Sequence, residues 1–251
     1  PAGKGVVIAE DLPMAETAIT AAMQERRFGA AGERLVIEEC LSGPELSYFV
    51  LSDGQSALSL ASAQDHKRAF DDDRGPNTGG MGAFAPSVLL DTNLESQIVR
   101  EIVEPVVSGM EAEGQPFRGF LYVGLMLTRE GPKVIEFNVR LGDPGAQVVL
   151  PLIDEPLLPL LIAAAEGRLR SRACRLRNDK LVGVVIASRG YPELSESGLP
   201  IEGVVAAERI SHVTVLHAGT ARRDGALVTA GGRVLTVVVS GPSFDVAIGR
   251  A

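Results

Sequence analysis

The stretch of residues 133–147, KVIEFNVRLGDPGAQ, constrains this chain more than any other. Its β-forming residues predict a buried strand that ends at a Gly-Asp-Pro turn. Side chains two residues apart share one face of a strand, which would carry Glu136, Asn138 and, just beyond, Arg140. A carboxylate and an amide oxygen suit a hard cation such as Mg²⁺, and a guanidinium suits a phosphoryl group. The alternative is an edge strand with a solvated polar face and an ordinary turn.

Composition and charge narrow the class of protein. Of 251 residues, 45% are apolar and 22% charged, which is typical of a soluble globular chain of about one to three domains. The 24 Lys and Arg against 32 Asp and Glu give a net charge of −8. This charge disfavours duplex nucleic acid and anionic membranes as partners, but not a small phosphate ligand. Two cysteines without CxxC spacing favour a reducing cytoplasm, and no apolar run reaches the about 18 residues of a membrane span.

The first residues of the chain hold a candidate phosphate-binding turn. Gly3, Lys4 and Gly5 could set backbone N–H groups and an ammonium against phosphates. A plain surface turn is the better interpretation of the bare tripeptide. A short strand over residues 6–9 and a helix over residues 14–27 are expected to follow. Asp11 or Leu12 would cap this helix, with Pro13 in its first turn.

A second candidate for nucleotide contacts comes at the end of a strand predicted over residues 34–41. Glu38, Glu39 and Leu41 precede a Ser-Gly-Pro turn, and Glu45 follows it. A nucleotide could use backbone groups here for its base and Glu45 for its ribose hydroxyls. A solvated strand end explains the same residues equally well.

The central part of the chain predicts a hairpin followed by a long polar loop over residues 64–85. Gln64, His66 and Lys67 concentrate hydrogen-bond donors in it, and the amides of Thr78, Gly79 and Gly80 could face an anion. The alternative is a mobile surface loop. Further expected elements are helices over residues 92–113, interrupted at Pro105, and 157–166, and a strand over residues 117–128 that pairs with the opening stretch.

Arginines alternate with small residues after position 168 and indicate a boundary. Strands predicted over residues 181–187, 213–218, 226–229 and 233–240 make the rest a small β-rich domain. We therefore place a domain boundary at about residue 170.

Several motifs, taken together and in order, carry a resemblance to a known family; they are AGKG (2–5), IEECLSGPELS (37–47), QDHKR (64–68), GPNTGGMGAFAP (75–86), GFLYVGLM (119–126), VIEFNVRLGDP (134–144), HAGT (217–220) and GGRVL (231–235). The chain resembles the glycinamide ribonucleotide synthetases, also called phosphoribosylamine–glycine ligases. The resemblance implies an α+β chain with an ATP-grasp fold. The chain would then consist of a partial small lobe over residues 1–41, a large lobe with the metal and substrate site over residues 42–170, and a C-terminal β-rich domain over residues 171–251.

The resemblance also implies a reaction of purine biosynthesis, in which ATP, glycine and 5-phosphoribosylamine give glycinamide ribonucleotide, ADP and phosphate through a glycyl phosphate. Mg²⁺ or Mn²⁺ would bind Glu136 and Asn138, Arg140 would stabilise the transferred phosphoryl group, and Asp143 would hold an amine. The other implied contacts are with ATP, by Gly3, Lys4, Gly5, Glu38, Glu39, Leu41 and Glu45, and with substrates, by Gln64, His66, Lys67, Thr78, Gly79, Gly80 and Asp143. The implied partners are small molecules in the cytoplasm, with no nucleic acid and no membrane, and a monomer is favoured.

Two departures from the family pattern leave alternatives open. Gly145 stands where the family usually has Glu after the Gly-Asp-Pro turn. The family also begins well upstream of residue 1 and extends to a final helix, so we expect a fragment with impaired activity. The alternatives are a non-catalytic nucleotide-binding module, or another ATP-grasp carboxylate–amine ligase or carboxylase.

Overall fold

The computed structural model describes residues 6–72, 74–170 and 173–251. The chain forms two compact units, Pro1–Ser42 and Gly43–Ala251, which are described one at a time. In the first unit, α1 (Leu12–Ile19) continues as a π-helical segment, η1 (Thr20–Gln24), and a short 3₁₀ helix, η2 (Gly29–Glu33), follows. Asp11 caps α1 by accepting a hydrogen bond from the Met14 amide at 2.8 Å, and a proline occupies the first turn, as the sequence predicts.

The two strands predicted in this unit, over residues 6–9 and 34–41, are wrong. Neither segment has regular secondary structure, and Val36 and Ile37 are 84% and 83% exposed. A strand needs a neighbour that accepts and donates its ladder hydrogen bonds. Within the described residues of this unit no such neighbour exists, so β-forming composition alone does not make these segments strands.

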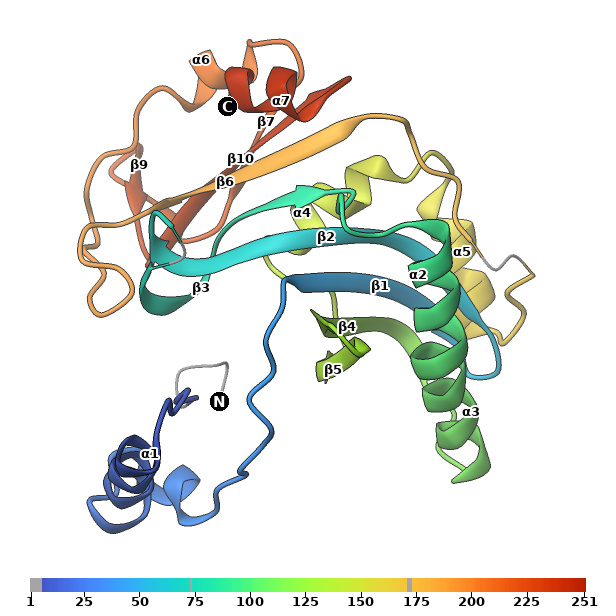
Figure 1. The fold of residues 1–251 in the computed structure, drawn as a ribbon. Coiled ribbons are helices and arrows are strands. Elements are labelled where there is room, and N and C mark those ends of the chain that lie inside the picture. The colour runs from blue at the N-terminus through green and yellow to red at the C-terminus, as the bar shows by residue number, and fades with distance from the viewer. Residues whose placement is uncertain (1–5, 73, 171–172) are drawn as a thin grey trace. The chain divides into compact units, whose positions relative to one another are not determined.

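The second unit is built on an eight-stranded antiparallel sheet with the order β5-β4-β1-β2-β3-β6-β10-β7 (Figure 1). Its strands are β1 (Glu45–Asp53), β2 (Ala57–Phe70), β3 (Arg74–Ala85), β4 (Arg118–Thr128), β5 (Gly131–Asn138), β6 (Lys180–Ala187), β7 (Val213–His217) and β10 (Arg233–Gly241). The predicted hairpins β1–β2 and β4–β5 are confirmed.

The long polar loop predicted over residues 64–85 is wrong, because most of it is the hairpin of β2 and β3. Gln64 pairs with Phe84 and His66 with Gly82, and the register then shifts on the way to the Arg68–Asn77 pair. Glycine and polar residues are poor strand formers in isolation. Here the pairing of β3 with both β2 and β6 fixes the backbone.

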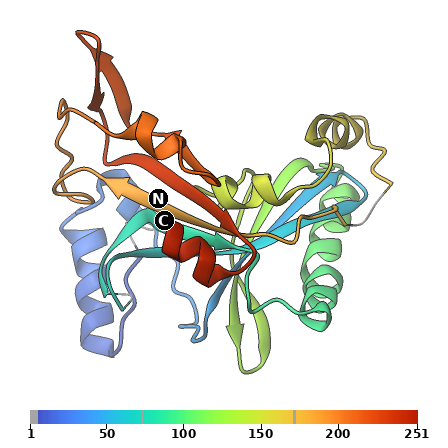
Figure 2. The same ribbon diagram turned by 90° about the horizontal axis from the view of Figure 1, so that it is seen from above.

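The sheet has two faces, which we define by residues of β1. The front face carries Ser47 and Phe49 and is covered in part by α4 (Gly145–Val149), η4 (Leu150–Leu152) and α5 (Leu157–Ala165). The back face carries Tyr48 and Val50 and is covered by α2 (Thr92–Ile98), the π-helical η3 (Val99–Val103) and α3 (Glu104–Ala112). Figure 2 shows these two groups of helices on opposite sides of the sheet. Pro105 lies in the first turn of α3, directly after the π-helical η3, so the helical run over residues 92–112 changes its hydrogen-bond pattern next to the proline without ending there.

The C-terminal strands continue the same sheet instead of forming one of their own. β3 pairs with β6, and β10 lies between β6 and β7. The remaining elements are α6 (Val204–Glu208), the two-stranded sheet of β8 (Thr220–Arg223) and β9 (Ala226–Thr229), and α7 (Phe244–Arg250). The sequence analysis did not predict the helix α7. None of the described helices is long and apolar enough to cross a membrane.

Asp53 ties the end of β1 to the rest of the unit and yields a prediction on stability. It is 2% exposed and accepts hydrogen bonds from the amides of Gln55 (3.0 Å), Ser56 (2.7 Å) and Leu169 (2.9 Å). Burial alone would raise the pKa of the Asp53 carboxyl, but these donors and the Arg118 guanidinium hold it below its usual value. Its contribution to stability is therefore complete above the unfolded pKa of about 3.9 and is lost as the pH falls through the folded pKa.

Replacing Asp53 by Ala should lower the free energy of unfolding by about 2–3 kcal/mol at pH 7, because three buried N–H groups lose their acceptor. Urea denaturation of both proteins at pH 7 and pH 3 measures this. The difference between the free energies of unfolding of the two proteins should be smaller at pH 3 than at pH 7. An equal difference at both pH values would contradict the role of the ionised carboxylate.

Candidate functional site

The predicted metal ligands lie together on the front face at the edge of the sheet. On β5, Glu136 pairs with Gly124 of β4, and Asn138 pairs with Tyr122. A side chain at position 124 would have its Cβ 3.3 Å from Cγ of Glu136 and 3.3 Å from the Tyr122 hydroxyl oxygen. The glycine therefore leaves the space in which the carboxylate and the phenol approach each other.

The strand that carries these residues is an edge strand and is not buried as predicted. Val134, Ile135 and Phe137 are 37–41% exposed. β5 lies at the end of the sheet, where it pairs only with β4, and a bulge interrupts its register before Glu136. The alternative interpretation, that this stretch is an edge strand with a polar face, is therefore confirmed for its place in the fold. It does not decide what the polar face binds.

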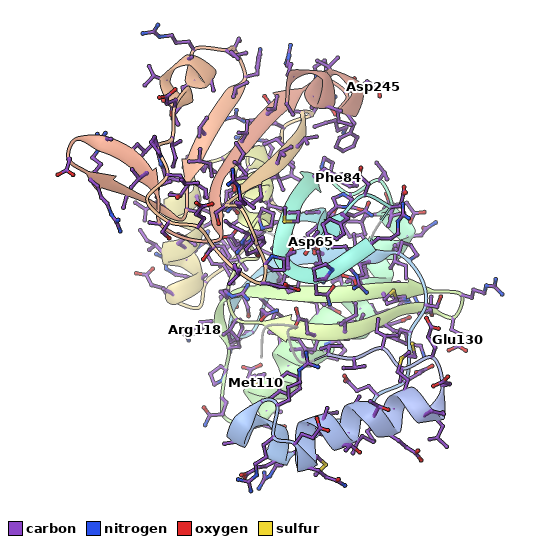
Figure 3. All side chains as sticks on the ribbon, turned by 90° about the vertical axis from the view of Figure 1, so that its left-hand side faces the viewer. Asp65, Phe84, Met110, Arg118, Glu130 and Asp245 are labelled. Carbon is purple, nitrogen blue, oxygen red and sulfur yellow. The ribbon has the colours of Figure 1, made fainter. Side chains whose placement is uncertain are left out.

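A hydrogen-bonded row of side chains continues from Tyr122 across the front face. The Ser47 hydroxyl lies 3.0 Å from the Tyr122 hydroxyl and donates to Oδ1 of Asp65 at 3.1 Å. Burial, reinforced by the nearby carboxylate of Asp65, raises the pKa of Tyr122, so the phenol keeps its proton at neutral pH. Figure 3 places Asp65 on the sheet, well away from the β4–β5 turn at Glu130.

Lys67 brings a cation to the same face. Its ammonium is 2.6 Å from Oε2 of Glu45, and its side chain is 35% exposed. Burial alone would lower the pKa of the Lys67 ammonium, but the carboxylates of Asp65 and Glu45 outweigh it and hold the pKa above its usual range. Lys67 is therefore charged at neutral pH and within reach of a phosphate that enters from solvent.

The Gly-Asp-Pro turn meets the predicted glycine loop of β3. Arg233, the first residue of β10, donates from Nη1 to the carbonyl of Gly79 (2.8 Å), the carbonyl of Asp143 (2.8 Å) and Oδ1 of Asp143 (3.1 Å). Gly80 has φ +117, and a Cβ there would lie 2.5 Å from Cδ of Pro144. Only glycine allows both this backbone conformation and this approach.

The backbone amides that the sequence offers to an anion already have acceptors in the protein. The Gly79 amide donates to the Tyr191 hydroxyl at 2.8 Å, and the Gly80 amide donates to the Thr78 hydroxyl at 3.0 Å. An anion would therefore have to replace these bonds. The role of Thr78, Gly79 and Gly80 as substrate contacts stays a prediction.

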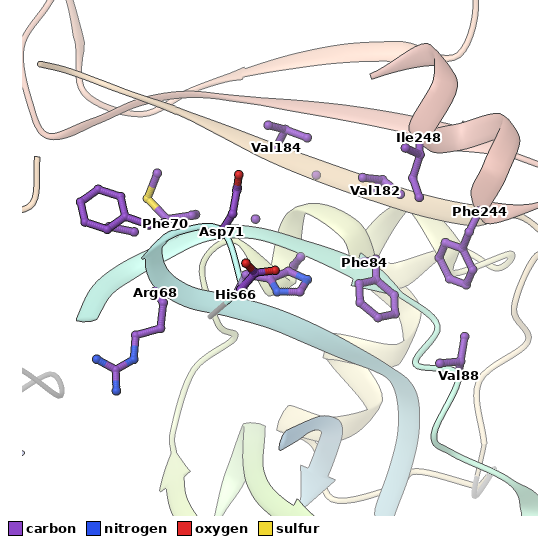
Figure 4. Close-up of a pocket in the computed structure, with 16 residues that line it drawn as sticks. His66, Arg68, Phe70, Asp71, Phe84, Val88, Val182, Val184, Phe244 and Ile248 are labelled. Carbon is purple, nitrogen blue, oxygen red and sulfur yellow. The ribbon is translucent and has the colours of Figure 1, made fainter. Parts of the chain in front are cut away.

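Gln64 and His66 do not lie with Lys67, because neighbouring residues of a strand point to opposite faces. The Gln64 side chain accepts a hydrogen bond from Ser87 at 3.0 Å. The His66 ring packs against Phe84 on the back face, where both line a cavity of about 680 Å³ between the β2–β3 hairpin, β6 and α7 (Figure 4). Of the three predicted donors, the structure thus places only Lys67 on the front face.

The remaining predicted residues are less constrained. Gly3, Lys4 and Gly5 lie outside the described residues. Glu38, Glu39 and Leu41 belong to the first unit and lie in a segment without regular structure. In the second unit, Arg140 follows the end of β5, is exposed and donates to the carbonyl of Leu141 at 3.0 Å.

Sequence reasoning missed Ser47, Asp65, Tyr122, Tyr191 and Arg233. Asp65 alternates with Gln64 and His66, and this alternation would have separated the two faces had a strand been expected there. Arg233 lies in the GGRVL motif, which contributed to the resemblance, but no residue of this motif was assigned a function. Nothing in the sequence around Tyr191 shows that it reaches residue 79.

The fold and the polar residues of the front face together place the chain in the ATP-grasp class of proteins. Comparison with known proteins then gives the family. The family model described as phosphoribosylglycinamide synthetase, ATP-grasp (A) domain, matches residues 1–146, and the model of the C domain of the same synthetase matches residues 181–251. The chain belongs to the phosphoribosylglycinamide synthetase family.

Individual relatives agree with this assignment. The chain is 45% identical over 250 residues to a phosphoribosylamine–glycine ligase of Brucella melitensis and 48% identical over 240 residues to that of Rhizobium meliloti. It spans 58% and 56% of the length of these relatives. The crystal structure of the Thermotoga maritima ligase aligns with a TM-score of 0.82 at 34% identity, covering 100% of this chain and 62% of that one. The biotin carboxylase domain of a Hydrogenobacter thermophilus 2-oxoglutarate carboxylase, at 18% identity and a TM-score of 0.68, covers 100% of this chain and 53% of that one and shares the fold.

Gly145, where the sequence departs from the family pattern, is buried against the ring of Phe49. A Cβ at position 145 would lie 2.8 Å from Cζ of Phe49, which is itself fully buried. The structure therefore leaves no room for a side chain after the Gly-Asp-Pro turn unless this ring moves.

Replacing Gly145 by Ala should lower the free energy of unfolding by about 1–3 kcal/mol, because the core at Phe49 becomes overpacked. Replacing Phe49 by Leu should also destabilise the protein, by leaving space in the core. The double variant should lose less than the sum of the two, because the smaller residue accommodates the new methyl group. Urea denaturation of the four proteins measures this, and strict additivity would show that the two positions do not compete for space.

Proposed function

We propose that this chain supplies the ATP-dependent step that joins glycine to 5-phosphoribosylamine in purine biosynthesis, giving glycinamide ribonucleotide, ADP and phosphate. The observation that carries the proposal is the set of polar residues on the front face. Strands of one sheet carry Glu136, Asn138 and Lys67. The turn at Asp143 is hydrogen-bonded to the first residue of β10 in the same sheet. The named relatives are phosphoribosylamine–glycine ligases, which supports this choice of substrates.

The donor set of β5 fits a divalent cation that is shared with a nucleotide. Within the described residues, no three His, Cys, Asp or Glu side chains form a metal cluster. Mg²⁺ does not require one, since it commonly binds one or two carboxylates and takes its other oxygens from water and phosphates. Glu136 and Asn138 would hold Mg²⁺ or Mn²⁺, and the bound ion would offset the negative charge of the ATP phosphates.

The reaction has two steps, both of which balance without a general base from the protein. A glycine carboxylate oxygen attacks the γ-phosphorus of ATP, and the bond from phosphorus to the oxygen of ADP breaks. The phosphoribosylamine nitrogen then attacks the acyl carbon of glycyl phosphate, phosphate leaves, and the nitrogen loses a proton to solvent. In this proposal Lys67 and Arg140 bind phosphate oxygens, and Asp143 orients an amine.

The other contacts stay proposals as well. The phosphates of ATP would be contacted by Gly3, Lys4 and Gly5. The base would be contacted by Glu38, Glu39 and Leu41, and the ribose hydroxyls by Glu45. Glu45 would have to share its carboxylate between the ribose and Lys67, to which it is already bonded. Substrate contacts by Gln64 and His66 would require an approach from the back face, which makes them the weakest of the assignments. We place the reaction in the cytoplasm on the sequence argument from cysteine spacing.

One observation favours a second candidate function, a nucleotide-binding module without ligase activity. The ring of Phe49 fills the space beside Gly145, so the carboxylate usual after the turn in the family has no counterpart there. Such a module would bind Mg·ATP without glycine-dependent turnover. Release of ADP that requires both glycine and phosphoribosylamine separates the ligase from the module, and ADP release that does not require glycine would remove the ligase assignment.

Replacing Glu136 by Ala should abolish the stabilisation of the protein by Mg·ATP, because the metal loses its carboxylate ligand. A ligand at 100 times its dissociation constant stabilises a protein by about 2.7 kcal/mol, which makes the loss measurable as a shift of the melting temperature. Replacing Glu130 by Ala is the matched control, since this residue lies at the turn of the same hairpin (Figure 3). Melting temperatures that do not respond to Mg·ATP in either the wild type or the Glu136 variant would exclude the metal assignment.

A further inference from the structure

The side chain of Tyr122 leans over a glycine of the front face. Gly124 of β4 pairs with Glu136 of β5 on one side and with Ser47 of β1 on the other. A Cβ at position 124 would lie 3.3 Å from the Tyr122 hydroxyl oxygen and 3.1 Å from Cε1 of its ring. The phenol therefore takes the place of a side chain at position 124. Its oxygen has Ser47 on one side and the side chain of Glu136 on the other.

Packing holds the ring of Tyr122 in this position. The ring meets that of Phe49 edge-on, with the ring centroids 5.4 Å apart. Gly142 of the turn lies against Cδ2 and Cε2, where a Cβ would be 3.8 Å away from each. Tyr122 is only 7% exposed, and a ring packed in this way keeps one rotamer. The hydroxyl oxygen thus has a fixed place beside Glu136.

The direction of the hydrogen bonds follows from the number of protons. Ser47 donates its single hydroxyl proton to Oδ1 of Asp65 at 3.1 Å. The 3.0 Å contact between the two hydroxyl oxygens then needs the proton of Tyr122, because Ser47 has no other to give. Tyr122 therefore donates to Ser47, and its own oxygen keeps the capacity to accept a hydrogen bond. Both O–H dipoles point towards Asp65, so their negative ends face β5, and each bond polarises the next.

We propose that Tyr122 and Ser47 are positioning residues for the divalent cation on Glu136 and Asn138, with the Tyr122 oxygen accepting a hydrogen bond from the hydration shell of that ion. This inference rests on the proposed function for the presence of the ion. Mg²⁺ dehydrates reluctantly and keeps several waters in most protein sites. These waters are hydrogen-bond donors, and a phenol oxygen whose proton is already committed is an acceptor that matches them.

Other ligands for the Tyr122 oxygen fit less well. Lys67 bonds to Glu45 at 2.6 Å, and within the part of the chain that the structure describes no hydrogen bond joins it to Tyr122. Direct coordination of the ion by Tyr122 would compete with better ligands. The carboxylate of Glu136 and the amide oxygen of Asn138 make no hydrogen bond or ion pair to other described residues, and both are stronger oxygen ligands than a neutral phenol.

Binding of Mn²⁺ to the full chain in the presence of ADP tests the proposal, with free Mn²⁺ measured by electron paramagnetic resonance. Tyr122→Phe keeps the ring and removes only the hydroxyl group. We expect it to weaken Mn²⁺ binding about tenfold, which is the usual loss when an outer partner of a metal site is removed. Ser47→Ala should also weaken Mn²⁺ binding, by up to about tenfold, because the Tyr122 proton loses its acceptor and turns towards Glu136.

Tyr48→Phe is the matched control. Tyr48 is also buried, and its hydroxyl also contacts a serine, Ser59, and a carboxylate, Glu95, but on the back face of the sheet. This variant should lose stability in urea denaturation, as Tyr122→Phe does, and should bind Mn²⁺ with unchanged affinity. A general loss of folding would instead weaken Mn²⁺ binding in both variants.

Tyrosine absorption provides a readout that a purely structural role would not change. The chain has three tyrosines and no tryptophan, so the difference spectrum between Mg·ADP and ADP alone reports on phenol groups in the tyrosine band. We expect a difference signal in the wild type and in Tyr48→Phe, and none in Tyr122→Phe. A phenolate band in the wild type would show direct coordination of the ion and would overturn the proposal.

The outcomes separate this proposal from the proposed function. Equal Mn²⁺ affinity in the wild type and Tyr122→Phe, or a difference signal that persists without Tyr122, would overturn the positioning role even if ADP release requires glycine. Absence of Mn²⁺ binding in the wild type would remove both the metal assignment and the positioning role. Failure of the ligase proposal alone would show as Mn²⁺ binding that depends on Tyr122 together with ADP release that does not require glycine.

Discussion

The pairing of β3 with β6 is the interaction on which the candidate site depends. Gly82 to Ala85 pair with Val184 to Leu181, and this ladder joins the strands from β5 to β3 with β6, β10 and β7 in one sheet. Because β10 lies next to β6, its first residue, Arg233, reaches the carbonyls of Gly79 and Asp143. The C-terminal strands thus hold the turn that follows β5, although about 90 residues separate them in the chain. Without this ladder the turn would keep its local conformation but lose its position over the sheet.

Small residues set how closely the parts of the site approach each other. Gly80 admits Pro144 of the turn, Gly124 leaves space between Glu136 and Tyr122, and Gly145 accepts the ring of Phe49. The charges on the front face are then paired with one another instead of being buried alone: Lys67 lies between Glu45 and Asp65, whose carboxylates keep its ammonium charged. Paired charges at a partly exposed surface cost little, and they are available to a ligand that brings charges of its own.

The two faces of the sheet serve different purposes. The front face gathers carboxylates, a lysine, a tyrosine and the turn at Asp143, whereas the back face is covered mainly by α2, α3 and α7. Alternation along β2 distributes the QDHKR motif between them, with Asp65 and Lys67 in front and His66 against Phe84 behind. Motif residues that are adjacent in sequence therefore need not act on the same ligand.

The sequence by itself determined the family, the β4–β5 hairpin, and the Glu-x-Asn spacing that puts two side-chain oxygens on one face, since these depend on local residue order. It also predicted the cap of α1 and most C-terminal strands, whose signals are short-range. It failed where pairing partners decide the outcome. Residues 34–41 have β-forming side chains but no ladder, whereas the glycine-rich residues 74–85 become β3 because β2 and β6 lie on either side. Only the tertiary structure brought Arg233 to the Gly-Asp-Pro turn and Tyr191 to Gly79, because these contacts and that of Arg233 with Gly79 span 90 to 154 positions, and no local pattern encodes such a distance.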